Sequence, residues 1–296
     1  MIRHIATVLA LAGLAGCSAT QAPPVLAPSA PGIRVGFSAP TPTGVTAVAA
    51  LTGVTPAYVE TFAGPGSSFP SAWAGLAAKD GATLVIQLDT GSIPLSHIAA
   101  GDDDAWLRSY AKAVAAWPHP VAIGIDHEFN GPWWPWSYQH ETPASFVAAW
   151  RHVVTLFRQE GAKVSWVWTI SNVTGPQAAG LAPYWPGAGY VTDIGVNAYY
   201  YRASDTFASV FTPVLAEARA LSGKPVLVTE TGANPSSGQA RAIGDLFAGI
   251  AATPEALGFI WFDYDKASAN GDPHNWLIEG DPAALAAFRT AVREYG

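Results

Sequence analysis

Short apolar runs recur along the chain from Ile33 onward, and longer stretches with helical spacing separate them. Each run is too short for a helix and is rich in β-branched or aromatic residues, which indicates a buried strand. Eight such runs can be distinguished: Ile33–Ser38, Ala57–Phe62, Thr83–Leu88, Val121–Ile125, Val164–Trp168, Thr192–Ala198, Pro225–Thr229 and Gly258–Phe262. Buried strands that alternate with helices are typical of βα units and a parallel sheet.

Several stretches between these runs have the signals of helices. The clearest are Asp102–Ala116, Pro143–Glu160, Thr206–Leu221 and Ser237–Ala252. Thr142 and Pro143 match an N-cap followed by proline in the first turn, and the same pattern at Asp281 and Pro282 predicts a last helix over Pro282–Tyr295. Because eight parallel strands are the number that closes a barrel, the predicted fold class is α/β, a single-domain (β/α)8 TIM barrel over residues 33–296.

The N-terminus has the pattern of an export signal. A basic start at Arg3 precedes an apolar run that is too short to span a bilayer, and Leu14-Ala15-Gly16-Cys17 follows. This tetrapeptide resembles the lipobox of bacterial lipoproteins. We therefore expect a signal peptide over residues 1–16, a lipidated Cys17, and an Ala/Pro/Ser-rich tether that completes residues 17–32. The alternative is an ordinary secretory signal.

The overall composition narrows the class of partner. Half of the residues are hydrophobic, 12% are charged and the net charge is −7, a balance that argues against a nucleic-acid partner. Cys17 is the only cysteine, so no intrachain disulfide can form. We expect a monomer on the outer face of a bacterial membrane, attached only through its lipid, with an uncharged partner such as a neutral sugar chain.

Candidate chemistry is concentrated after the fourth predicted strand. Val121–Ile125 carries His127 and Glu128 at its C-terminal tip, and three tryptophans, Trp133, Trp134 and Trp136, follow a turn. A carboxyl group beside a histidine and aromatic faces is suited to binding and cleaving a sugar chain. In (β/α)8 barrels the C-terminal ends of the strands form the rim that carries the active site. Other polar residues also follow strands there: Asp89, Asn172, Tyr199–Tyr201, Glu230, Asp263 and Asp265.

A second carboxylate ends the seventh predicted strand. A single glutamate in such a place is more often a loop cap or a partner for arginine than a catalytic group. Glu230 and Glu128 together follow two strands of one barrel, which favours a pair of acids facing across its mouth. Cleavage of a glycosidic bond requires two such carboxyl groups.

Five motifs follow one another along the chain: His127–Gly131 with Trp133 and Trp136, Trp166–Trp168, Tyr184–Gly187 ahead of Asp193–Tyr199, Lys224–Gly232, and Trp261-Phe262. In this order they resemble glycoside hydrolase family 26. The resemblance extends from about Leu84 to the C-terminus. Most members of that family are endo-β-1,4-mannanases, and β-1,3-1,4-glucanases and β-1,3-xylanases are minorities.

The resemblance implies a retaining, endo-acting hydrolase of a β-linked polysaccharide, with β-1,4-mannan as the first candidate and no cofactor. Glu128 matches the acid/base and Glu230 the nucleophile. The matching substrate-binding residues are His127 near the 2-hydroxyl, Tyr199 beside the nucleophile, Trp261 beneath the attacked sugar, and Trp133 and Trp136 on the leaving-group side.

The chain also departs from the family pattern. Gly124 stands where members usually have an arginine three residues before the histidine, and Gln87-Leu88-Asp89 replaces a Trp-Glu-Pro-like strand end. These changes leave room for a non-catalytic carbohydrate-binding barrel. A metalloprotease reading of His127-Glu128 is disfavoured because Gly131 occupies the position of the second histidine in H-E-x-x-H, so no metal is expected.

Overall fold

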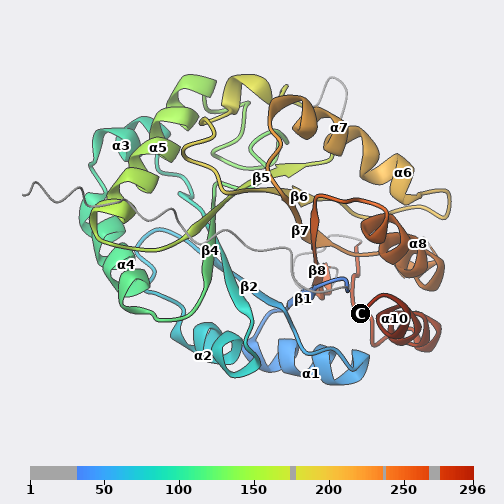
Figure 1. Ribbon diagram of the computed structural model, residues 1–296. Helices are drawn as coiled ribbons and strands as arrows, with labels where there is room; N and C mark the ends of the chain where they lie inside the picture. Colours follow the sequence, from blue (N-terminus) through green and yellow to red (C-terminus); the bar gives the residue numbers. More distant parts are fainter. Residues whose placement is uncertain (1–31, 174–177, 236–237, 267–273) are drawn as a thin grey trace, which may run out of the picture.

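The protein forms a closed barrel of eight parallel strands in sequence order, surrounded by helices (Figure 1). This computed structural model describes residues 32–173, 178–235, 238–266 and 274–296. The predicted single-domain (β/α)8 barrel is therefore confirmed. The strands are β1 (Val35–Ser38), β2 (Tyr58–Ala63), β3 (Thr83–Leu88), β4 (Val121–Ile125), β5 (Ser165–Ser171), β6 (Asp193–Asn197), β7 (Val226–Thr231) and β8 (Ala256–Phe262).

The surrounding helices follow the predicted order with local differences. They are α1 (Pro42–Thr52), α2 (Ser71–Asp80), α3 (Leu95–Ala100), α4 (Asp104–Ala116), α5 (Pro143–Gln159), α6 (Phe207–Val210), α7 (Thr212–Leu221), α8 (Gln239–Ala251) and α10 (Pro282–Tyr295). The helix predicted over Thr206–Leu221 is divided at Phe211, and Pro213 lies in the first turn of α7. None of the helices in the described ranges is long and apolar enough to cross a membrane.

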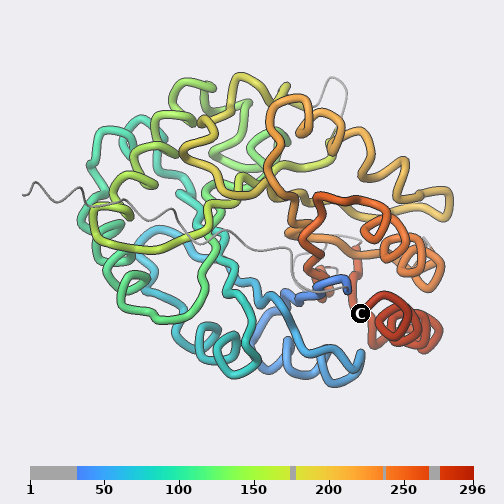
Figure 2. Tube along the Cα trace, viewed as in Figure 1, coloured from blue at the N-terminus to red at the C-terminus, as the bar shows by residue number. Residues whose placement is uncertain are grey.

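The first and last described segments lie side by side, so the blue start and the red end of the chain meet in Figure 2. The backbone N–H of Ile33 donates to the carbonyl oxygen of Tyr295 at 2.7 Å. Phe288 of α10 packs edge-on against Phe247 of α8, with ring centroids 5.3 Å apart. The predicted signal peptide, Cys17 and all of the tether except Gly32 lie outside the described residues.

The inside of the barrel changes from apolar to polar toward the C-terminal rim. One apolar layer inside the barrel consists of Tyr58, Val85, Ala122, Val167, Leu227, Leu257 and Ile260. Side chains alternate along a strand, so the residues two positions further on point inward as well. Among them are Glu60, Gln87, Gly124, Thr169 and Thr229, and the four with side chains are almost fully buried. A layer of polar side chains therefore lies just beneath the C-terminal rim, and the candidate site lies above this layer.

Candidate active site

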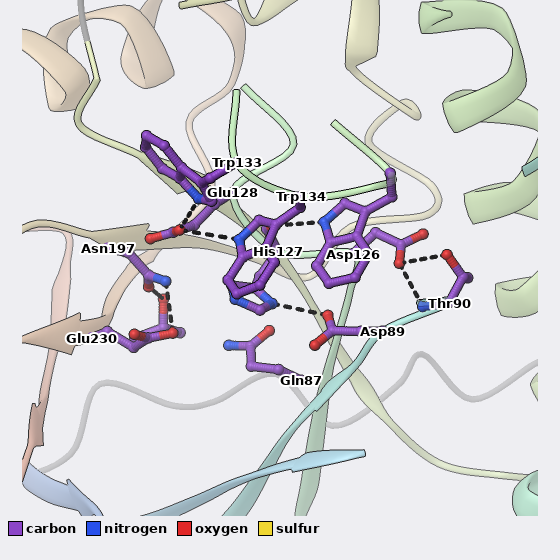
Figure 3. A network of polar contacts seen from close by, with 12 residues as sticks. Gln87, Asp89, Thr90, Asp126, His127, Glu128, Trp133, Trp134, Asn197 and Glu230 are labelled. Carbon is purple, nitrogen blue, oxygen red and sulfur yellow. Dashed lines mark hydrogen bonds and ion pairs between the residues drawn. The ribbon is translucent and has the colours of Figure 1, made fainter. Parts of the chain in front are cut away.

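The backbone after β4 turns two consecutive side chains toward the mouth of the barrel. Asp126 and Glu128 have positive φ angles, 51° and 56°, which residues with a side chain seldom adopt. A regular strand would send His127 and Glu128 to opposite faces. The left-handed residues interrupt that alternation, and both side chains lie over the barrel in Figure 3. Such local strain is typical of functional sites.

A bulge in β7 turns Glu230 inward. Gly195 pairs with Leu227, whereas Asn197 pairs with Glu230, so β7 contains one more residue than β6 over this interval. Leu227 and Thr229 already face the interior, and the extra residue brings Glu230 to the same side. Bulges commonly redirect a side chain beside an active site.

Both oxygens of Glu230 accept hydrogen bonds. Asn197 donates its Nδ2 to Oε1 at 2.8 Å, and the Tyr199 hydroxyl donates to Oε2 at 2.5 Å. The hydroxyl of Thr229 donates to Asn197 at 2.7 Å and fixes the orientation of that amide. Burial and the charge of Glu128 raise the pKa of Glu230 above its ordinary value, whereas His127, Tyr199 and Lys266 lower it. His127, Tyr199 and Lys266 therefore oppose the rise and favour the ionised form of Glu230.

Glu128 accepts hydrogen bonds from described residues on one of its two oxygens. Its Oε2 accepts the indole N–H of Trp133 at 2.7 Å and that of Trp134 at 3.3 Å. The side chain lies at the rim, and the residue is 9% exposed. No hydrogen bond to Oε1 is present among the described residues, so this oxygen can serve a substrate.

His127 is paired with the aspartate that follows β3. Its Nδ1 lies 2.8 Å from Oδ1 of Asp89. Burial alone would lower the pKa of His127, but the charge of Asp89 and the hydrogen bond to it raise that pKa to about 10. The imidazole is therefore a cation at neutral pH. Asp126 faces away from the mouth and accepts two hydrogen bonds from Thr90.

A neutral pair lies beneath this cation. Gln87 Nε2 donates to Glu60 Oε1 at 3.0 Å, and Figure 3 shows the Gln87 amide below His127, between Glu230 and Asp89. Burial and the charge of Glu230 raise the pKa of Glu60 well above its ordinary value. Glu60 therefore holds a proton. Neither Glu60 nor Gln87 was predicted as a site residue, although strand alternation from Tyr58 and Val85 places both inside the barrel.

Two tryptophans that were predicted to contact the sugar, Trp261 and Trp136, are not positioned to do so. Trp261 points outward, where it packs at 89° on Phe288 of α10 and is 1% exposed. The reason is alternation in β8, because Ile260 and Phe262 face inward and Trp261 lies between them. Trp136 is 4% exposed and donates its indole N–H to the His127 carbonyl oxygen, so it cannot offer a free face to a sugar.

Other aromatic side chains line the mouth instead. Phe62 is 37% exposed and contacts both His127 and Phe262, with ring centroids 5.6 and 6.3 Å away. Tyr199 packs on Trp276 at 4.6 Å. Trp133 is 47% exposed and donates its indole N–H to Glu128, and its contact with sugar on the leaving-group side stays a prediction. Phe62 was missed because the sequence shows its strand but not the exposure of its ring.

A cavity of about 260 Å³ lies next to Tyr199. Most of its lining residues carry a polar group, and they come from the loops after β5 and β6 and from α6: Asn172, Tyr199, Tyr201, Arg202, Asp205, Ser209 and Val210. The cavity shares Tyr199 with Glu230, so it extends the site along one side of the mouth. Across the described ranges, no three His, Cys, Asp or Glu side chains are arranged to hold a metal ion.

Two carboxyl groups, one after β4 and one in β7, at the C-terminal rim of a closed (β/α)8 barrel, define a protein of the barrel glycosidase class. A family model described as glycosyl hydrolase family 26 matches residues 105–268, more than half of the chain. The chain therefore belongs to glycosyl hydrolase family 26, a family of glycoside hydrolases, and the resemblance drawn from its motifs is confirmed.

Individual relatives are distant. Endoglucanase H of Acetivibrio thermocellus is 26% identical over 228 residues, which are 72% of this chain and 25% of that protein. The chain thus spans about a quarter of the length of this relative. A modular endo-β-1,4-mannanase from Cellulomonas fimi has a TM-score of 0.70 at 18% identity and covers 88% of this chain and 70% of its own. A family 26 β-mannanase from Bacteroides ovatus has a TM-score of 0.68 at 16% identity and covers 88% of each chain. These two structures share the fold.

Proposed function

We propose that this domain is a retaining, endo-acting glycoside hydrolase of a β-linked polysaccharide. The observation that carries the proposal is the unequal bonding of the two rim carboxyl groups. Glu230 accepts hydrogen bonds on both oxygens, as a nucleophile held ionised requires, whereas Glu128 keeps one oxygen open. Two carboxyl groups in different environments are suited to different roles in one reaction.

In the first step Glu230 attacks the anomeric carbon and forms an ester as the glycosidic C–O bond breaks. The electron pair of that bond passes to the leaving oxygen, which takes the proton of Glu128. In the second step water gives a proton to Glu128 and attacks the same carbon, and the ester bond breaks to release Glu230. This double displacement keeps the anomeric configuration.

The surrounding residues have consistent roles in this scheme. The cationic His127 faces the sugar and balances the negative charge of the two acids. Tyr199 holds Glu230 in place through its hydroxyl. The exposed rings of Phe62 and Trp133 offer apolar faces to sugar rings, in place of Trp136 and Trp261.

For the substrate, β-1,4-mannan is the first candidate, supported by the mannanases that share the fold. Endoglucanase H supports a β-1,3-1,4-glucan as the second, and a β-1,3-xylan is the third. The purified domain should be incubated with mannan, lichenan, xylans and cellulose, with reducing ends and viscosity followed together. We expect one polymer to lose viscosity early, as internal cleavage requires. Binding without cleavage of any polymer would instead support a carbohydrate-binding barrel.

The mechanism has its own test. Glu230→Gln should abolish turnover of every substrate. Glu128→Ala should retain the first step for aryl glycosides with good leaving groups, and azide should restore the second. NMR of the first product formed should show the β-anomer. Equal losses in both variants without azide rescue, or an α-anomer as first product, would refute these assignments.

We also propose that the protein is exported and anchored by lipid on Cys17, with its barrel outside the cytoplasm. The support is the sequence Leu14-Ala15-Gly16-Cys17 after a short apolar run. Cys17→Ser should move the full-length protein from the detergent phase to the aqueous phase of a Triton X-114 extract of the expressing bacteria. An unchanged distribution would contradict the anchor.

A further inference from the structure

We infer that Trp133 and Trp134 act as a clamp on Glu128 that reserves Oε1 for the proton delivered to the leaving group. The inference rests on the proposed role of Glu128 as the acid/base. It makes these two tryptophans positioning residues, which act on the reaction through a carboxyl group.

The geometry around Oε2 carries the inference. The indole nitrogens of Trp133 and Trp134 lie 2.7 and 3.3 Å from this single oxygen. A carboxylate oxygen has two lone-pair sites, and an indole N–H can only donate. Both sites of Oε2 are therefore filled whether Glu128 is protonated or ionised, so the proton must be on Oε1.

Each indole is fixed by contacts of its own. The Trp134 ring stacks on Trp136 with centroids 5.1 Å apart and planes at 15°, and Trp136 is tied by its N–H to the His127 carbonyl oxygen at 2.8 Å. Trp133 lies directly over Gly131, where a β-carbon would be 2.3 Å from the indole ring. Gly131 thus permits the close approach that brings the Trp133 nitrogen to Glu128.

The clamp becomes stronger during the first step of the reaction. As the proton leaves Oε1 for the departing oxygen, negative charge develops on Glu128. Hydrogen bonds to a charged acceptor are about twice as strong as those between neutral groups. Donors already in place therefore stabilise the transition state more than the ground state. A substrate whose leaving group needs little protonation gains little from the clamp.

This dependence on the leaving group provides the test. Trp133→Phe, Trp134→Phe and the double variant keep an aromatic ring and remove the N–H. Their kcat/KM would be measured on aryl β-mannobiosides of graded leaving-group acidity, or on aryl β-cellobiosides if the polymer panel identifies a glucan. We expect the double variant to lose about tenfold or more on the phenyl glycoside, as loss of bonds to a charged group predicts, and less than about twofold on the 2,4-dinitrophenyl glycoside.

Gly131→Ala offers an independent variant, because it displaces the Trp133 ring and leaves the indole intact. It should show the same selective loss as Trp133→Phe. Trp106→Phe is the matched control, since Trp106 lies on α4 and its indole N–H donates to the carbonyl oxygen of Ser67, not to Glu128. The control should retain full activity on the whole series. Trp133 is half exposed, so its single variant preserves the test if the double variant does not fold.

Glu128→Gln separates this inference from the proposed function. A steep leaving-group dependence of kcat/KM in Glu128→Gln would support Glu128 as the acid. If the tryptophan variants then lose the same factor in kcat/KM on every glycoside, or lose no activity, the clamp is refuted while the role of Glu128 as the acid is retained. If Glu128→Gln shows no such dependence, the acid assignment fails first. Adding Trp133→Phe to Glu128→Gln should cause no further selective loss, and an additional selective loss would refute action through Glu128.

Discussion

The amide oxygen of Gln87 occupies the space that a side chain on Gly124 would need, because a β-carbon there would lie 2.1 Å from Oε1. Family resemblance leads one to expect an arginine at this position. Here the same volume holds a neutral amide that donates to Glu60, a buried carboxyl that keeps its proton. A cation above this layer is His127, which depends on Asp89 for its charge.

Gly124→Ala should therefore destabilise the barrel by about 1–3 kcal/mol, the usual cost of overpacking. Adding Gln87→Ala should recover part of that loss, because it removes the atom that the new methyl group meets. Urea unfolding of both single variants and the double variant measures the coupling. Gly75→Ala is the control, since nothing lies within 4 Å of its β-carbon in α2, and it should not destabilise. Additive losses at Gly124 and Gln87 would contradict the packing argument.

The strands of this barrel could be predicted because each is a short apolar run with a turn on either side. β3 and β4 have the predicted bounds, and the other six agree within a few residues. Helix α1 was not predicted, although Thr41 caps it and Pro42 follows, the same signal that located α5. The cap signal is therefore present in the sequence, but the apolar residues between the first two strands do not form a clear helical stripe beside it.

The two proposed catalytic acids, Glu128 and Glu230, could be located at strand ends from the sequence, but the directions of their side chains could not be predicted. The inward direction of Glu230 depends on a bulge, and that of Glu128 on two left-handed residues, neither of which the residue pattern reveals. Trp261 illustrates the reverse error. Alternation from Ile260 would have turned it outward, but the resemblance assigned it to the floor of the site. Alternation along the strand was the better guide there.

Tyr199→Phe should move the acidic limb of the pH–activity profile to higher pH. The Tyr199 hydroxyl donates to Glu230 at 2.5 Å and lowers the pKa of that carboxyl, so its removal raises the pH at which Glu230, the proposed nucleophile, ionises. A hydrogen bond to a charged group corresponds to a shift of about one pH unit. The profile of kcat/KM reports this ionisation in the free enzyme.

Tyr200→Phe is the control for that measurement. Its hydroxyl donates to Asp245 at 3.1 Å, outside the mouth of the barrel, so the acidic limb should not move. A Tyr199→Phe profile that falls in height without a shift would show that the tyrosine shapes the site but does not tune Glu230.

Asp89→Asn should remove a pH-dependent part of the stability. The folded pKa of His127, about 10, exceeds the value of about 6.5 expected in the unfolded chain. The pair therefore stabilises the fold fully below pH ~6.5 and loses its effect as the pH rises through about 10. Loss of one partner of a buried pair costs roughly 3–5 kcal/mol. Urea unfolding should show a gap of this order between wild type and variant at pH 6 that closes by pH 10.5.

The exposed pair of His97 and Asp102, 3.7 Å apart, supplies the control. Both side chains are more than half exposed, so Asp102→Asn should change the stability little at either pH. If the gap for Asp89→Asn were the same at pH 6 and pH 10.5, the cost would come from packing and not from the charge of His127.

Glu60→Gln should make the protein more stable than wild type at alkaline pH. Burial and the charge of Glu230 raise the folded pKa of Glu60 well above the value of about 4.3 in an unfolded chain. Unfolding above that pH releases a proton from Glu60, so wild-type stability falls as the pH rises, whereas glutamine has no proton to lose. Because the amide matches the protonated acid in shape and can still accept from Gln87, the two proteins should be similar near pH 4.5. By pH 8 the free energy of unfolding of the variant should exceed that of wild type by about 1 kcal/mol or more.

Urea unfolding across this range measures the difference. Glu294→Gln on α10 is the control, because it shows the effect of losing one surface charge. A gap that does not depend on pH, or a variant weaker than wild type at pH 8, would mean that Glu60 is ionised in the folded barrel.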